Sequence, residues 1–176
     1  PVPLFIVFAV TLFVYSFNRL SDYAEDKQNV PTRASFVSRY GRVLLALGGI
    51  LYAVAIAVAV WLQVPGAPAL GIPVVVAVLY STVGLKRVLL VKNLLVGLSW
   101  GLIPVGVGVY YGRLASFDVQ FFAVFVTVML TIAAVVFDIK DIDGDSEQGI
   151  RTVPVVLGTK RTRQLSAGAT ALVGAC

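Results

Sequence analysis

The sequence contains no histidine, and its single cysteine, Cys176, is the last residue. Imidazole therefore takes no part in catalysis or metal binding, and these 176 residues form neither an internal disulfide nor a thiolate cluster. Charged residues are also scarce, at 13%. The metal ligands that remain available are oxygen atoms, which suit hard cations.

Apolar residues are plentiful, at 59%, and the mean hydropathy of +0.92 is far above that of a soluble domain. The apolar runs are too numerous to be a signal peptide. They cover 1–17, 43–62, 70–85, 94–112 and 121–137, and another begins at 165. We predict a single all-α domain, a polytopic transmembrane helix bundle, with polar connections at 28–42 and 149–163.

An acidic cluster directly follows the run that ends at Phe137, where four aspartates fall within eight residues. On a helix, Asp138, Asp141 and Asp145 share one face, which is unfavourable unless a cation neutralises them. Asp143 points away from that face and is expected to be solvated. Oxygen-only ligands favour Mg²⁺. The alternative is a solvated acidic loop at the end of a membrane helix.

A second acidic cluster lies about 120 residues upstream, after the first apolar run. Asn18, Asp22 and Asp26 are spaced by four residues, so they also line one helical face. Two such helix ends facing each other would hold Mg²⁺, which keeps positions open for water and phosphate. A diphosphate is the natural ligand of this pair. The alternative is that these side chains only cap and solvate a helix end.

The two clusters resemble the Asp-rich motifs of the UbiA superfamily of intramembrane prenyltransferases. Asn18-x-x-x-Asp22-x-x-x-Asp26 is similar to the first motif. Asp138-x-x-Asp141-x-x-x-Asp145, followed by Gly149-Ile-Arg-Thr152, is similar to the second. The resemblance spans nearly the whole chain. It implies a fragment, truncated at both ends, that runs from the second into the seventh of nine helices.

Two departures from the family pattern leave the subfamily, and so the acceptor, open. Many members have Asp directly after the first Asn, where this chain has Arg19. Many also read Asn-Arg-Pro-x-Arg-Pro, where this chain has Asn29-Val-Pro31-Thr-Arg33-Ala34. Arg19 could pair with Asp22 or extend along the membrane surface.

The resemblance implies Mg²⁺-dependent transfer of a polyprenyl group from an allylic diphosphate to an aromatic or lipid acceptor within the membrane. The catalytic residues would be Asp22, Asp26, Asp141 and Asp145. The metal ligands would be Asn18, Asp22, Asp26, Asp138, Asp141 and Asp145.

Basic side chains suit the diphosphate, because guanidinium and ammonium groups pair with phosphate oxygens. Tyr80 and the pair Lys86-Arg87 are similar to family residues, as is Arg33. We expect the diphosphate to be bound by Lys86, Arg87, Lys92 and Arg33. The alternative is that these charges only set membrane topology.

Alternating the spans across a bilayer puts both motifs on one side. Of the 14 Lys and Arg residues, all but Arg113 fall on that side, which the positive-inside rule makes cytoplasmic. Basic loops beside lipid need no nucleic acid to explain them.

Two other functions remain open. A CDP-alcohol phosphotransferase also pairs aspartates with Mg²⁺ at a membrane, but its compact Asp-Gly-x-x-Ala-Arg signature is absent. A cation transporter would place acidic residues in the middle of its spans, whereas these lie at span ends.

Overall fold

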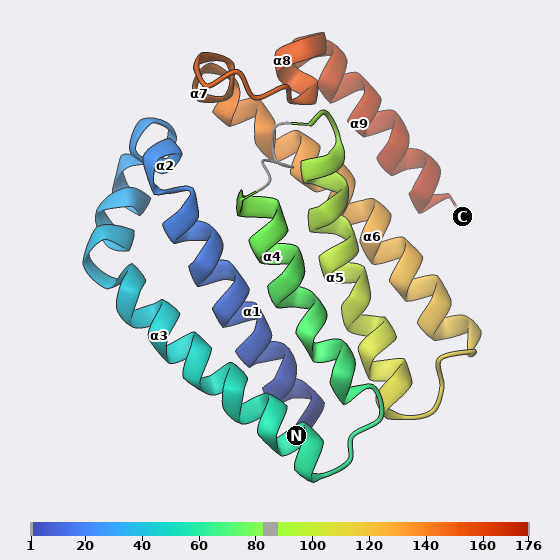
Figure 1. The fold of residues 1–176 in the computed structure, drawn as a ribbon. Helices are drawn as coiled ribbons and strands as arrows, with labels where there is room; N and C mark the ends of the chain where they lie inside the picture. Colours follow the sequence, from blue (N-terminus) through green and yellow to red (C-terminus); the bar gives the residue numbers. More distant parts are fainter. Residues whose placement is uncertain (1, 83–87, 176) are drawn as a thin grey trace.

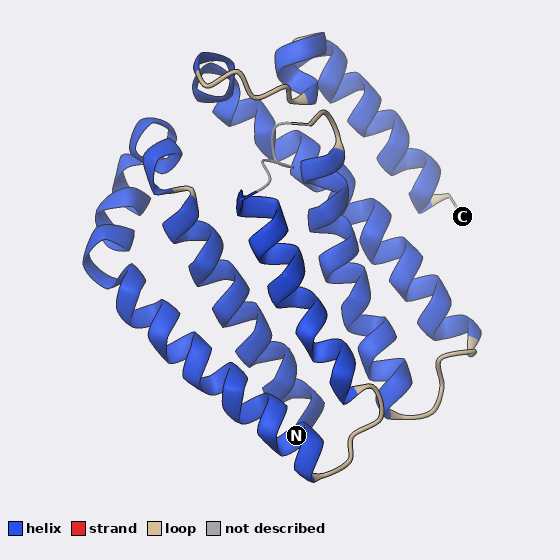
Figure 2. Cartoon of the chain, viewed as in Figure 1, coloured by secondary structure: helices blue, strands red, loops and turns tan. Residues whose placement is uncertain are grey.

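The computed structural model describes residues 2–82 and 88–175, and within these ranges all regular structure is helical (Figure 2). The elements in chain order are α1 (Val2–Ser21), α2 (Tyr23–Asn29), α3 (Pro31–Trp61), η1 (Ala67–Gly71), α4 (Ile72–Thr82), α5 (Val91–Tyr110), α6 (Phe117–Phe137), η3 (Asp138–Asp141), α7 (Ile142–Glu147), α8 (Val153–Leu157) and α9 (Thr159–Gly174).

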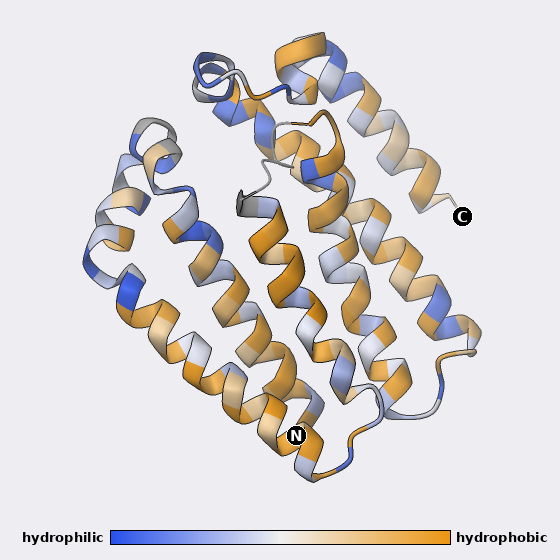
Figure 3. Ribbon diagram, in the orientation of Figure 1, coloured by the Kyte–Doolittle hydropathy of each residue, from blue (hydrophilic) through white to orange (hydrophobic). Residues whose placement is uncertain are grey.

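Four helical stretches of the described residues are long and apolar enough to cross a membrane: Val2–Ser21, Pro31–Trp61, Val91–Tyr110 and Phe117–Glu147. Each has at least 20 residues, and a helix of that length spans a hydrocarbon layer of about 30 Å. Apolar residues run along the shafts of the helices, whereas the hydrophilic ones gather near their ends (Figure 3). The prediction of an all-α transmembrane bundle is therefore confirmed.

The polar connections predicted at 28–42 and 149–163 are largely helical. Helix α3 begins at Pro31 and continues through the polar segment into the apolar run. Proline fits the first turn of a helix because it has no N–H to satisfy there, and backbone hydrogen bonds form whatever the side-chain polarity. Hydropathy thus located only the apolar part of α3. In the second segment, α8 forms and α9 already begins at Thr159.

Helices α5 and α6 lie in close contact along their length because α5 presents glycine to α6. A Cβ atom added to Gly97 would overlap Oγ1 of Thr131 and the carbonyl oxygen of Thr127. A Cβ atom added to Gly101 would overlap Oγ1 of Thr127. Helices in membranes commonly associate through small residues that let their backbones approach closely. Lipid tails are as apolar as the side chains, so the hydrophobic effect does not drive this association.

The two acidic motifs lie at the same end of the bundle. Figure 1 shows α2, α7 and α8 together at that end, and the connections from α3 to α4 and from α5 to α6 at the opposite end. Helix α2 continues the chain from α1, and α7 continues it from α6. The helices therefore bring together two segments that are distant in sequence.

We predict that Gly101→Val separates α5 from α6, because the added side chain collides with Thr127. Overpacking of this kind costs about 1–3 kcal/mol, which corresponds to a fall of about 5 °C in the melting temperature of the purified protein. The matched control is Gly106→Val, since Gly106 lies on the same helix and a Cβ atom there meets nothing within 4 Å. Equal melting temperatures for the two variants would contradict this account of the contact.

Candidate functional site

The first motif remains in helical register although α1 ends at Ser21 and α2 begins at Tyr23. The backbone N–H of Asp22 donates to the carbonyl oxygen of Asn18 at 2.8 Å, and that of Asp26 donates to Asp22 at 2.9 Å. These two bonds preserve the spacing of four residues across the break. The common face predicted for the three side chains is therefore compatible with the backbone.

Asp26 is buried and has two arginine partners. Nη2 of Arg33 donates to its Oδ1 at 2.6 Å, and Nη1 of Arg19 lies 3.5 Å from its Oδ2. Only 4% of Asp26 is exposed, so its charge needs this compensation in the absence of water. Because α3 starts at Pro31, Arg33 lies in its first turn and can reach back to α2.

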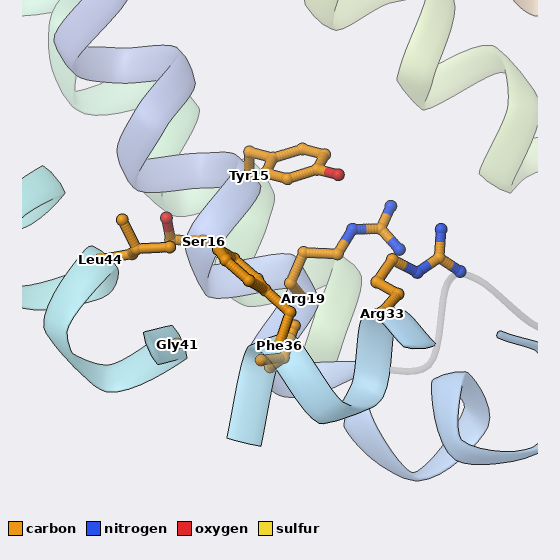
Figure 4. Close-up of a pocket in the computed structure, with 8 residues that line it drawn as sticks. Tyr15, Ser16, Arg19, Arg33, Phe36, Gly41 and Leu44 are labelled. Atoms are coloured by element: carbon orange, nitrogen blue, oxygen red, sulfur yellow. The ribbon is translucent and has the colours of Figure 1, made fainter. Parts of the chain in front are cut away.

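A cavity of about 100 Å³ lies beside the two arginines (Figure 4). Figure 4 shows the guanidinium groups of Arg19 and Arg33 extending to the same side, with the ring of Tyr15 nearby. The guanidinium carbon of Arg19 is 4.9 Å from the centre of that ring, a cation–π contact. The cavity is lined by Tyr15, Ser16, Arg19, Arg33, Phe36, Val37, Gly41 and Leu44.

The second motif surrounds Lys92, the second residue of α5. Nζ of Lys92 is 2.8 Å from Oδ1 of Asp138 and 3.6 Å from Oδ2 of Asp145. Nδ2 of Asn93 donates to the other Asp138 oxygen at 2.8 Å. Asp138 and Asp145 are both buried, whereas Asp143 is exposed. The 3₁₀ turn at Asp138–Asp141 thus leaves Asp138 and Asp145 directed at the same lysine.

The two motifs meet where α2 contacts α7. Asp141 lies close enough to Arg33 and to Lys92 to interact electrostatically with both, so it links the two charged clusters. Three buried oxygen atoms near this junction accept no hydrogen bond within the described part of the chain. They are Oδ1 of Asn18, Oδ1 of Asp141 and Oδ2 of Asp145.

This meeting of two acidic helix ends agrees with the comparison to known families. The model of the UbiA prenyltransferase family matches residues 2–176. The chain belongs to the UbiA prenyltransferase family. Members of this family are intramembrane prenyltransferases, and the apolar helices support an integral membrane protein. No curated protein and no solved structure matches the chain significantly.

The unpaired oxygens of this UbiA-family site are of the chemical type that a hard cation accepts. All three orphaned oxygens are carboxylate or amide oxygens, the ligands that Mg²⁺ accepts, and they come from both motifs. Among the residues that the structure describes, no three acidic side chains converge closely enough to form a metal site by themselves. Lys92 lies between Asp138 and Asp145. Asp26 is held by Arg19 and Arg33.

The cations predicted to bind diphosphate have two different outcomes. Lys86 and Arg87 lie outside the described residues. Arg33 and Lys92 are at the site, but each contacts a motif carboxylate. Asn93, which is only 1% exposed, was not anticipated from the sequence. An amide at the start of an apolar run, next to a lysine, is the signal that could have identified it, because buried Asn in membrane helices hydrogen-bonds across helices.

We predict that Asn93→Leu destabilises the UbiA-family site, because Asp138 loses a donor that it cannot replace with water. An unsatisfied buried acceptor costs about 1–3 kcal/mol, enough to lower the melting temperature by several degrees. The control is Ser99→Ala on the same helix, since the Ser99 hydroxyl is exposed and donates to the carbonyl oxygen of Leu95 within its own helix. If Asn93→Leu and the wild-type protein have the same melting temperature, the bond to Asp138 is not a structural constraint.

Proposed function

We propose that the chain transfers a polyprenyl group from an allylic diphosphate to an aromatic or lipid acceptor within the membrane, in a Mg²⁺-dependent reaction. The observation that carries this proposal is the meeting of two acidic motifs, about 120 residues apart, beside half-buried cations at one end of an apolar bundle. Family membership supports the same class of reaction.

Residues of both motifs would hold the metal. These are Asn18 and Asp22 from the first, and Asp138, Asp141 and Asp145 from the second. Asp26 and Asp138 would each bind the metal only by releasing a present partner, because both oxygens of each carboxylate are engaged. When bound, Mg²⁺ neutralises the diphosphate and makes it a better leaving group.

The cations of the chain would stabilise the negative charge of the leaving diphosphate. Arg33 and Lys92 now contact carboxylates, and a bound diphosphate offers them oxygens of similar geometry. The bond between the first prenyl carbon and the diphosphate oxygen breaks, and its electron pair leaves with the diphosphate. An electron-rich atom of the acceptor then bonds to the allylic carbon, and the acceptor loses a proton. The surrounding apolar helices exclude water, which would otherwise capture the allylic cation.

Prenyl transfer tests the proposal directly. Membranes containing the protein should transfer label from geranylgeranyl diphosphate to a member of a panel of aromatic and lipid acceptors, and EDTA should abolish the transfer. Asp141→Asn and Asp145→Asn should each lower the rate about 100-fold or more, because each removes a charged ligand at the reacting diphosphate.

Asp143→Asn is the matched control, because Asp143 belongs to the same segment but is exposed. It should retain nearly wild-type activity at equal expression. Transfer that survives thorough chelation would remove the proposed role of both motifs. Equal damage from Asp143→Asn and Asp141→Asn would contradict the proposed ligand set.

We also propose that the motif end of the bundle faces the cytoplasm, because Arg113 alone among the basic residues that the structure describes lies at the opposite end. In a Cys176→Ser background, cysteines introduced at Ser35 and Thr159 should react with a membrane-impermeant maleimide from the cytoplasmic side. A cysteine at Ser116 should react from the other side. Labelling of positions 35 and 116 from one side would contradict this topology.

A further inference from the structure

The end of the bundle opposite the two acidic motifs carries one cation and one acid within the described part of the chain. The cation is Arg113, in the connection between α5 and α6, and the acid is Asp118, in the first turn of α6. Figure 1 shows this connection far from α2, α7 and α8. The features of this end are therefore independent of the proposed prenyl transfer.

An open cavity of about 380 Å³ lies where α5 ends and α6 begins. Arg113 and Asp118 both line it, yet neither forms an ion pair within the described part of the chain. The other lining residues used below are Val107, Tyr111, Ser116 and Val119. The cavity thus holds two charges of opposite sign that do not neutralise each other directly.

Hydrogen bonds that close the end of α5 hold the backbone of this cavity in place. The N–H of Arg113 donates to the carbonyl oxygen of Gly108 at 2.7 Å, and that of Gly112 donates to Val109 at 3.1 Å. With Gly112 at a φ of 64°, these two bonds form a Schellman motif. The Ser116 hydroxyl donates to the carbonyl oxygen of Arg113 at 2.8 Å. The connection is therefore ordered before any ligand binds, which lowers the entropy cost of binding.

The cavity lies at the level of the lipid headgroups of a bilayer. Helix α5 ends at Tyr110 and α6 begins at Phe117, and both helices belong to stretches long enough to cross a membrane. The large aromatic side chains of Tyr111 and Phe117 are mostly exposed at these two helix ends. Exposed aromatic residues at helix ends are typical of the membrane–water interface. Lipid headgroups are therefore the polar groups that surround this cavity.

We propose that this cavity binds the headgroup of a phosphoethanolamine lipid of the surrounding bilayer. The guanidinium of Arg113 pairs with the phosphate, because its N–H groups match two phosphate oxygens at once. The carboxylate of Asp118 accepts hydrogen bonds from the primary ammonium. Val107 and Val119 offer an apolar surface to the part of the lipid where the acyl chains begin.

The charges of the cavity favour this headgroup over the other common ones. A headgroup with a net negative charge would be attracted by Arg113 but repelled by Asp118, whereas a zwitterion satisfies both. Phosphocholine is also a zwitterion, but its quaternary ammonium has no N–H to donate to a carboxylate. Phosphoethanolamine combines the phosphate with a hydrogen-bonding ammonium, so it is the headgroup that uses both side chains.

Native mass spectrometry of the purified full chain in detergent tests the site, because it resolves each bound lipid. The probes are phosphatidylethanolamine, phosphatidylcholine and phosphatidylglycerol with identical acyl chains. The wild-type protein should bind its first phosphatidylethanolamine about three- to fivefold more tightly than either of the others, as expected for one additional exposed ion pair. Equal affinity for the three lipids, or tighter binding of phosphatidylglycerol, would overturn the proposal.

Two variants separate the roles of the two charges. Asp118→Asn keeps the shape of the side chain and removes its charge, so it should abolish the preference for phosphatidylethanolamine and leave the affinity for phosphatidylcholine unchanged. Arg113→Ala should weaken the binding of both lipids about three- to fivefold, because both contain the phosphate. A preference for phosphatidylethanolamine that persists in Asp118→Asn would overturn the assignment of the ammonium to Asp118.

Arg39→Ala and Asp143→Asn are the matched controls, since each removes an exposed charge of the same sign at the motif end of the bundle. Both should bind phosphatidylethanolamine as the wild type does. Without added lipid, Arg113→Ala and Asp118→Asn should have the melting temperature of the wild type, because neither residue has an ion-pair partner to lose. Equal losses of lipid binding in Arg39→Ala and Arg113→Ala would indicate unspecific attraction and overturn the site.

Glycerophosphoethanolamine, the same headgroup without acyl chains, distinguishes a bilayer lipid from a soluble phosphate ester. It should bind at least about 100-fold more weakly than the lipid, because it buries no acyl carbons. Equal binding of the two would overturn the assignment of the ligand to the bilayer. None of these measurements involves prenyl transfer, so their outcome does not depend on the proposed function.

Discussion

Compensation of buried carboxylates by a few cations is the constraint on which the motif end of this bundle depends. Lys92 holds Asp138 and Asp145 together. Asp26 on α2 is held by Arg19 from α1 and by Arg33 from α3. Each contact joins segments from different helices. A carboxylate that lost its partner would be left charged in an environment with little water. The same cations are therefore required for structure, and under the proposed function they would also bind a negatively charged substrate.

The helix contacts below the site make this arrangement possible. Close approach of α5 and α6 at Gly97 and Gly101 sets α5 against the helix that leads into the second motif. Lys92 and Asn93 lie at the start of α5. The contact between α5 and α6 therefore places them beside Asp138, at the end of α6. The small residues in the apolar region thus determine which polar groups meet at its end.

Much of the fold could be predicted from the sequence, because an apolar run long enough to cross a membrane directly predicts a helix. The boundaries were less accurate: α3 begins at Pro31, well before the apolar run, since side-chain polarity does not stop backbone hydrogen bonding. The acidic residues of the site were recognisable from their helical spacing. Arg33 and Lys92 were also predicted at the site, although as ligands of the diphosphate and not as partners of Asp26 and Asp138. Asn93 was not predicted, because its contact with Asp138 joins residues 45 positions apart and depends on helix packing.

The central claim is that the two motifs form one site in which a divalent metal and a diphosphate are neighbours. Electron–nuclear double resonance of Mn²⁺ bound to the purified chain with pyrophosphate tests this claim most directly. The account predicts a hyperfine coupling between the manganese and the phosphorus nuclei, and loss of that coupling when Asp141 and Asp145 are both changed to Asn. Bound Mn²⁺ and bound pyrophosphate without such a coupling would contradict it, because the two ligands would then occupy separate places.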